Sequence, residues 1–208
     1  MIGVKVLAVR YLAAASPALA AALGAPEGYP CLAMITADSD DPTYIALDEA
    51  TKAGDVKVCY THSFYAGAGN ASTAYAGEVI GVLAAPTPGA ARSGMEAVLG
   101  ALERIGFEEE QGVPYLAYTV SRTGSFLAKE AGINEGDALA YLIAPPLESM
   151  YAMDVALKAA DVKLCKLYTP PTETNFGGGL LTGTRSACEA ACAAFAEAVA
   201  EVAGQPKL

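Results

Sequence analysis

The chain has 208 residues, of which 53% are hydrophobic and only 17% are charged. This composition is typical of a folded protein with a sizeable core and excludes a disordered chain. The formal net charge of −10 argues against a nucleic-acid-binding protein, which needs a basic face. Alanine and glycine raise the mean hydropathy to +0.33, but no window of about 20 residues is free of charges and turn formers. We therefore expect neither nucleic acid nor a membrane as a partner.

The first half of the chain predicts alternating strands and helices. Glycine closes the first helix, and a proline lies near the first turn of the second, where its missing N–H has no helical partner to lose. In chain order the expected elements are a strand (4–10), a helix (16–23), a strand (32–37), a helix (42–53), a strand carrying Asp55-Val56-Lys57, a short strand, and an Ala-rich helix (90–105).

The second half predicts the same series. The expected elements are a strand (115–120), a helix (124–131), a strand (138–144), a helix (146–160), a strand carrying Asp161-Val162-Lys163, a short strand, and an Ala-rich helix (186–203). Strands that alternate with helices of this length predict an α/β (α+β) fold with sheets covered by helices.

An internal repeat links the two halves. Residues 154–165 match residues 48–59 at 8 of 12 positions, at a spacing of 106 (154 − 48). A second match pairs Arg185-Ser186 with Arg92-Ser93 at a spacing of 93 (185 − 92). Such long spacings indicate duplication of a whole domain and not a solenoid. We predict two domains, 1–107 and 108–208.

Two glycine-rich segments occupy matching places in the repeat, at residues 65–74 and 170–179. Glycine permits backbone conformations that are closed to other residues and weakens local order. The segments are either ordinary surface loops or mobile loops that pseudo-symmetry gathers around a shared axis. They lack the phosphate-loop pattern.

Three acidic residues, Asp38, Asp40 and Asp41, lie where a strand is expected to give way to a helix. Asp41 precedes Pro42 and could be the helix N-cap, because carboxylates are favoured at that end of the helix dipole. A divalent metal site and an anionic patch that binds or admits a small cation are the other interpretations. No further set of oxygen ligands is recognisable nearby.

Catalytic motifs find little support. His62 is the single histidine, at the end of an expected strand with no acid or nucleophile motif beside it, and a surface side chain is the favoured interpretation. Cys188 and Cys192 share a helix face among alanines, which favours a core position. The odd number of cysteines without a C-x-x-C pair predicts reduced, buried thiols; the five are Cys31, Cys59, Cys165, Cys188 and Cys192.

A series of ordered motifs lies at residues 36–44, 48–52, 63–68, 120–125, 144–148 and 173–183. Together these motifs resemble the EutL family, the tandem-domain shell proteins of ethanolamine-utilization microcompartments, and the likeness runs from about residue 4 to residue 202. It implies two circularly permuted microcompartment domains and three chains that form a flat pseudohexamer. Lateral contacts with other shell proteins would tile a shell within the cytoplasm. No enzymatic activity and no required cofactor are implied.

The resemblance also implies two kinds of opening for metabolites. One is a central pore gated by the two glycine-rich loops, with Tyr65, Gly67, Gly69 and Asn70 in the first loop and Asn175, Phe176, Gly177, Gly178 and Gly179 in the second. The other is a small acidic opening in each chain that binds ethanolamine and thereby favours the closed pore. Its expected residues are Asp40, Glu78, Phe107 and Thr174.

Two alternatives remain beside the shell protein. One is a metal-dependent enzyme of small-molecule metabolism that uses Asp38, Asp40 and Asp41. The other is a soluble ligand-binding regulator with the same duplicated domain, which would stay a discrete trimer and never form layers.

Overall fold

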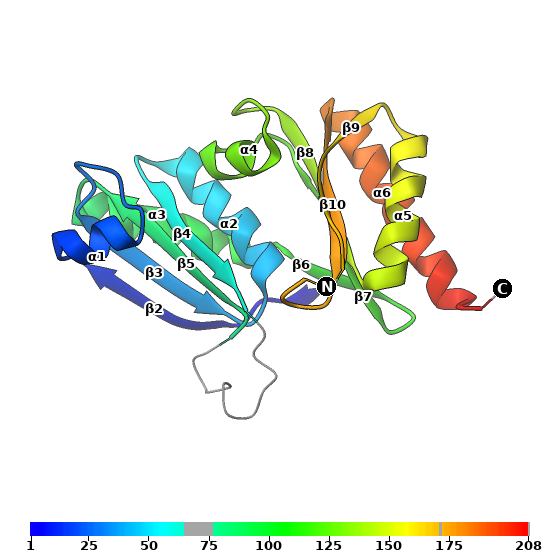
Figure 1. Ribbon diagram of the computed structural model, residues 1–208, viewed down its shortest axis with the longest axis horizontal. Helices are drawn as coiled ribbons and strands as arrows, with labels where there is room; N and C mark the ends of the chain where they lie inside the picture. The colour runs from blue at the N-terminus through cyan, green and yellow to red at the C-terminus, as the bar shows by residue number, and fades with distance from the viewer. Residues whose placement is uncertain (65–76, 171, 208) are drawn as a thin grey trace. The chain divides into compact units, whose positions relative to one another are not determined.

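The chain divides into two compact units in the computed structural model, which describes residues 1–64, 77–170 and 172–207 (Figure 1). The N-terminal unit comprises Gly3–Ile105 and Gly124–Leu127. The C-terminal unit comprises Met1–Ile2, Gly106–Thr123 and Ala128–Leu208. The main division thus falls close to the predicted boundary after residue 107, but each unit also takes a short segment from beyond it, which the prediction of two continuous domains did not include.

The N-terminal unit contains a four-stranded sheet with two long helices on one face. The strands are antiparallel in the order β2 (Val6–Leu12), β3 (Cys31–Ala37), β5 (Val79–Ala85) and β4 (Lys57–Ser63). Helices α2 (Asp40–Ala53) and α3 (Pro88–Leu102) pack against each other and on this sheet. The short helix α1 (Pro17–Ala22) precedes β3.

The two faces of this sheet are covered differently because strand side chains alternate between them. Gly81 of β5 faces Leu47 of α2, so the next residue, Val82, points to the opposite face. There Val82 joins a small buried cluster that is covered by the chain around α1, including Leu12 and Leu23.

The C-terminal unit repeats this arrangement. Its central strands have the order β7 (Val113–Val120), β8 (Ala138–Ala144), β10 (Gly177–Gly183) and β9 (Val162–Tyr168), and β6 (Gly106–Glu110) and β1 (Ile2–Gly3) extend the sheet beyond β7. Helices α5 (Pro146–Ala159) and α6 (Arg185–Gly204) pack side by side on one face, and α4 (Ser125–Ala131) connects β7 to β8 (Figure 1). The order β7-β8-β10-β9 is that of β2-β3-β5-β4, which confirms the repeat.

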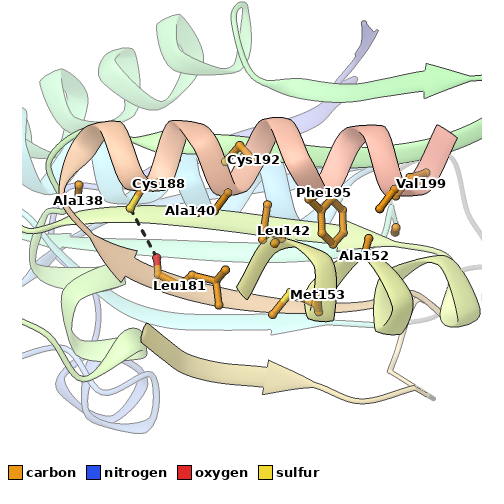
Figure 2. Close-up of a cluster of buried hydrophobic side chains, with 14 residues drawn as sticks. Ala138, Ala140, Leu142, Ala152, Met153, Leu181, Cys188, Cys192, Phe195 and Val199 are labelled. Carbon is orange, nitrogen blue, oxygen red and sulfur yellow. Dashed lines mark hydrogen bonds between the residues drawn. The ribbon is translucent and has the colours of Figure 1, made fainter. Parts of the chain in front are cut away.

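The core of the C-terminal unit lies between its sheet and helices α5 and α6. Figure 2 shows Phe195 of α6 over β8, beside Leu142, with Met153 of α5 nearby. Cys188 and Cys192 of α6 belong to the same buried cluster, as their position among alanines predicted. The small alanine side chains let the helices approach the sheet closely, so that one phenylalanine can fill the space between them.

The predicted strands and helices are present, with ends shifted by a few residues. One local interpretation was wrong: α2 begins at Asp40, with Ser39 as its N-cap residue, and Asp41 lies inside the first turn. The carboxylates of Asp40 and Asp41 are still well placed there, because the helix dipole favours negative charge at its N-terminus. In the described ranges, no helix combines the length and the apolar character needed to cross a membrane.

Asp48 of α2 holds the segment Gly124–Leu127 in the N-terminal unit. Its carboxylate accepts hydrogen bonds from the backbone N–H of Gly124 at 2.7 Å and of Leu127 at 2.9 Å. The hydroxyl of Thr51, one helical turn further along, accepts from the backbone N–H of Ser125 at 3.0 Å. Burial raises the pKa of Asp48, and the two amides and Lys52 oppose that shift.

Replacement of Asp48 should therefore be costly. We expect Asp48→Ala to lower the free energy of unfolding by about 2–4 kcal/mol, because two buried amides lose a charged acceptor. Urea denaturation measures the change. The matched control is Glu49→Ala, which removes only a partly exposed ion pair to Lys52 and should cost less than about 1 kcal/mol. Equal effects of the two substitutions would contradict this role of Asp48.

Candidate functional site

Three acidic residues lie at one end of the β3-β5-β4 sheet, where the charges of Asp38 and Asp40 act on Glu78. Asp38 follows β3, Asp40 opens α2, and Glu78 immediately precedes β5. The antiparallel pairing of β3 with β5 sets Ala37 opposite Val79. It thereby brings the acids on either side of this pair together, although they are 40 residues apart in the chain (78 − 38).

Backbone contacts fix the position of Glu78. Its N–H donates to the carbonyl of Ala37 at 2.8 Å, and its own carbonyl accepts from the N–H of Phe64 at 3.0 Å. The preceding Gly77 has φ of +63°, and a Cβ there would lie 2.1 Å from the Ala37 oxygen. Only glycine therefore fits this close approach.

The cluster concentrates negative charge in a partly dry place. Asp40 is only 7% exposed. Burial raises the pKa of its carboxyl, and hydrogen bonds from Ser63 and from the backbone N–H of Asp41 partly offset this effect. Burial also raises the pKa of Glu78, and the nearby charges of Asp40 and Asp38 raise it further.

The charge of this cluster is not neutralised by a side chain that the structure describes. Within residues 1–64, 77–170 and 172–207, no lysine, arginine or histidine forms an ion pair with Asp38, Asp40 or Glu78. The cluster is therefore suited to a small cation supplied from outside, which would relieve the repulsion between its carboxylates.

A hydroxyl pair beside Asp40 was missed by the sequence analysis. The hydroxyls of Tyr44 and Ser63 are hydrogen-bonded to each other, and Ser63 also bonds to Asp40. Tyr44 packs against Phe126, with ring centroids 6.1 Å apart. Both hydroxyl residues lie in motifs of the family resemblance, but only the fold shows that β4 ends next to the start of α2.

The other two expected binding residues belong to the C-terminal unit. Phe107 lies in β6, where its ring meets the ring of Phe176 edge-on at 5.7 Å. Thr174 lies in a turn in which the N–H of Asn175 donates to the carbonyl of Thr172 at 3.2 Å. The structure thus brings Asp40 together with Glu78, and Phe107 together with the segment that carries Thr174.

The first expected pore loop lies outside the described residues, and with it Tyr65, Gly67, Gly69 and Asn70. In the second loop, Asn175 is exposed with φ of +65°, and Phe176 accepts a hydrogen bond from the hydroxyl of Thr172 at 2.9 Å.

The expectation that Gly177, Gly178 and Gly179 form a loop was wrong, because they open strand β10. They pair with Ala144, Ile143 and Leu142 of β8. Close packing explains the glycines: a Cβ would lie 2.7 Å from Ser149 Oγ at Gly177, 1.9 Å from the Leu142 carbonyl at Gly178, and 2.4 Å from the Lys166 carbonyl at Gly179.

The remaining candidate residues form no reactive centre. His62 is exposed and stacks on Tyr60, with ring centroids 6.5 Å apart, in agreement with the surface position expected for it. The five cysteines are free thiols, three of them buried and Cys59 and Cys165 half-buried. Over the described ranges, no group of three or more His, Cys, Asp or Glu side chains could hold a metal ion. The metal-enzyme hypothesis thus gains no support from this part of the chain.

Known proteins settle the family. No protein-family model matches the chain. Over 206 residues, however, it is 58% identical to "Bacterial microcompartment shell protein EutL" of Clostridium perfringens (strain 13 / Type A), an alignment that spans 97% of the chain and 95% of the relative. The protein of the same name from Escherichia coli (strain K12) is 46% identical over 97% of the chain and 94% of its own length. The chain belongs to the EutL family of bacterial microcompartment shell proteins.

Solved structures agree with this assignment. The crystal structure of the ethanolamine utilization protein EutL from Leptotrichia buccalis C-1013-b matches with a TM-score of 0.95 and 54% identity over all of both chains. A trimeric microcompartment shell protein, PduB, shares the fold with a TM-score of 0.80 at 20% identity. The predicted mixed α/β fold with two tandem microcompartment domains is confirmed. As a EutL-family member, the chain is a structural protein of the microcompartment shell and not an enzyme.

The buried carboxyl of Asp40 predicts a pH-dependent stability. Its pKa in the folded chain is raised above the usual 3.8, so its contribution to stability is full below that pH and is lost as the pH rises through the raised value. We expect Asp40→Asn, which keeps the shape and the acceptor oxygen, to raise the free energy of unfolding near neutral pH. This gain should shrink as the pH falls toward about 4.

Urea denaturation over a pH series tests this expectation. Asp161→Asn, at an exposed position before β9, is the matched control for the loss of one carboxylate. A stabilisation by Asp40→Asn that grows toward acid pH would contradict the sign of the effect.

Proposed function

We propose that the protein forms trimeric tiles of an ethanolamine-utilization microcompartment shell and that the acidic cluster admits or binds ethanolamine. The observation that supports a cationic ligand is the cluster of Asp38, Asp40 and Glu78. These three acids have no basic partner in the described residues. The name of the Leptotrichia buccalis neighbour, an ethanolamine utilization protein, supports the same compound class.

Ethanolamine fits the chemistry of this cluster. Its ammonium group stays protonated near neutral pH, as that of lysine does, and it presents several N–H donors together with one hydroxyl. The carboxylates of Asp40 and Glu78 can accept from the ammonium, and such charge-assisted hydrogen bonds are the strong ones. Our proposal also includes Thr174, which would contribute a hydroxyl to the ligand, and Phe107, which would be its apolar neighbour.

Gating of a central pore is the second part of the proposal. A ligand shifts an open–closed equilibrium only by its different affinity for the two states. Thr174 lies in the turn before β10, next to Asn175 and Phe176 of the second expected pore loop. A ligand that contacts Thr174 would therefore bias the position of this turn, while the glycines of β10 stay fixed in the sheet.

Assembly is tested on the purified chain at increasing concentration. Analytical ultracentrifugation should show a trimer, and electron microscopy should show flat, hexagonally packed layers as the concentration rises. A monomer or an isolated dimer at every concentration would refute the tile. A trimer that never forms layers would favour the soluble regulator instead.

Ligand binding is tested by calorimetric titration with ethanolamine. We expect Asp40→Asn and Glu78→Gln to weaken binding about 10- to 100-fold, because each removes a charged acceptor for the ammonium. Glu103→Gln, an exposed glutamate at the end of α3, is the matched control and should bind as the native protein does. If Asp40→Asn and Glu78→Gln bind ethanolamine as tightly as the native protein, the acidic cluster is not its binding site.

A further inference from the structure

Helix α1 is an apolar helix that buries none of its side chains. It consists of proline, alanine and leucine over Pro17–Ala22, and none of these residues is buried. Leu19 is 42% exposed. Its counterpart in the second half of the chain has a different environment.

Local geometry fixes the correspondence between α1 and α4. Gly24 and Gly132 follow the two helices with φ of +72° and +67°, and Gly28 and Gly136 follow with φ of +83° and +92°. Both pairs are 108 positions apart (132 − 24 and 136 − 28). Leu19 therefore corresponds to Leu127.

Matching hydrogen bonds support this register. The N–H of Gly24 donates to the carbonyl of Ala21 at 3.0 Å, and the N–H of Gly132 to that of Lys129 at 3.3 Å. Ser16 and Pro17 accordingly correspond to Gly124 and Ser125.

Leu127 is covered where Leu19 is not. It is only 1% exposed, and it lies in the segment that Asp48 and Thr51 of α2 hold by its backbone amides. The segment that α2 holds by its backbone amides thus contains a buried leucine, whereas α1 leaves the equivalent leucine in solvent.

The counterpart of α2 is α5, and it is exposed at the equivalent place. Helix α5 runs 106 positions after α2 at both ends, Pro146–Ala159 against Asp40–Ala53. Asp154 thus corresponds to Asp48, but its side chain is 61% exposed where that of Asp48 is 0% exposed. Asp154 pairs with Lys158 of the same helix.

Two residues that form a hydrogen bond in the N-terminal unit are both replaced at the equivalent positions of α5 and α1. In the N-terminal unit, the hydroxyl of Thr51 accepts from the backbone N–H of Ser125. The equivalent positions hold Leu157 and Pro17. Proline has no N–H to donate and leucine has no acceptor, so acceptor and donor are absent together. An apolar contact replaces a hydrogen bond without leaving a polar group unsatisfied.

We propose that α1 of one copy of the chain docks on α5 of a second copy. Asp154 of the second copy accepts from the backbone N–H of Ser16, as Asp48 does from Gly124, and Leu19 becomes buried against α5. The contact is head-to-tail, and such contacts close into rings when their rotation allows it. The proposal rests on the trimeric tile proposed above and identifies the joint between its subunits.

The first test is Leu19→Asp, compared with Leu19→Met. The charged side chain cannot be buried at this joint, whereas methionine keeps the apolar volume. By sedimentation velocity we expect Leu19→Asp to be monomeric with a native circular dichroism spectrum, and Leu19→Met to assemble like the native chain. Native assembly of Leu19→Asp would overturn the joint.

Asp154→Ala gives a second test that leaves the fold of the single chain alone, because an exposed ion pair adds little stability. We expect the subunits to associate at least about tenfold more weakly, since a charged acceptor is lost from the joint. Glu189→Ala removes an exposed ion pair of the same spacing, with Arg185, and should leave association unchanged. Unchanged association in Asp154→Ala would contradict the role of Asp154.

The two proposals fail in different ways. If the native chain is monomeric at all concentrations, both the trimeric tile and the α1–α5 joint are refuted. If the native chain is a trimer and Leu19→Asp and Asp154→Ala leave it intact, only the joint is refuted, and the subunits associate through another surface.

Discussion

The carboxylate of Asp48 ties the two repeats of this chain together. It lies on α2 of the first repeat, and it accepts hydrogen bonds from the amides of Gly124 and Leu127 at the start of the second. A buried acid is costly unless its oxygens are satisfied, and here two backbone donors satisfy it. This contact places Gly124–Leu127 in the same compact unit as α2. At the equivalent position of the other repeat, Asp154 is exposed and pairs with Lys158 of its own helix.

The acidic cluster depends on a second constraint, the tight backbone approach at the edge of the β3-β5 pair. Gly77 lets the chain pass against the carbonyl of Ala37, and Glu78 is thereby set beside Asp40. Burial raises the pKa of both Asp40 and Glu78, and the charges of Asp40 and Asp38 raise that of Glu78 further. A bound ammonium would offset this effect, because it would stabilise the ionised form of both carboxyl groups.

Much of the fold was predictable because its signals are local. Proline and glycine mark the helix ends, alternating apolar runs mark the strands, and the match around Asp48 and Asp154 revealed the duplication. The errors occurred where tertiary packing decides. Gly177–Gly179 resemble a flexible loop in sequence, yet they pair with β8 as a strand. Glycine is needed there because neighbouring carbonyls and Ser149 leave no room for a Cβ. Asp41 resembles an N-cap, yet α2 starts one residue before it, after Ser39.

The sequence by itself determined the duplicated α/β architecture, the family and the acidic residues available for a cation, since each depends on residue type and spacing along the chain. Only the tertiary structure decided which of these residues meet. The pairing of β3 with β5 joins Asp40 to Glu78, the end of β4 adds Ser63, and the packing on α2 buries Asp48 while Asp154 stays exposed. These outcomes depend on contacts between segments far apart in sequence. Burial and the space around the backbone decide such contacts, and local secondary-structure propensity does not predict them.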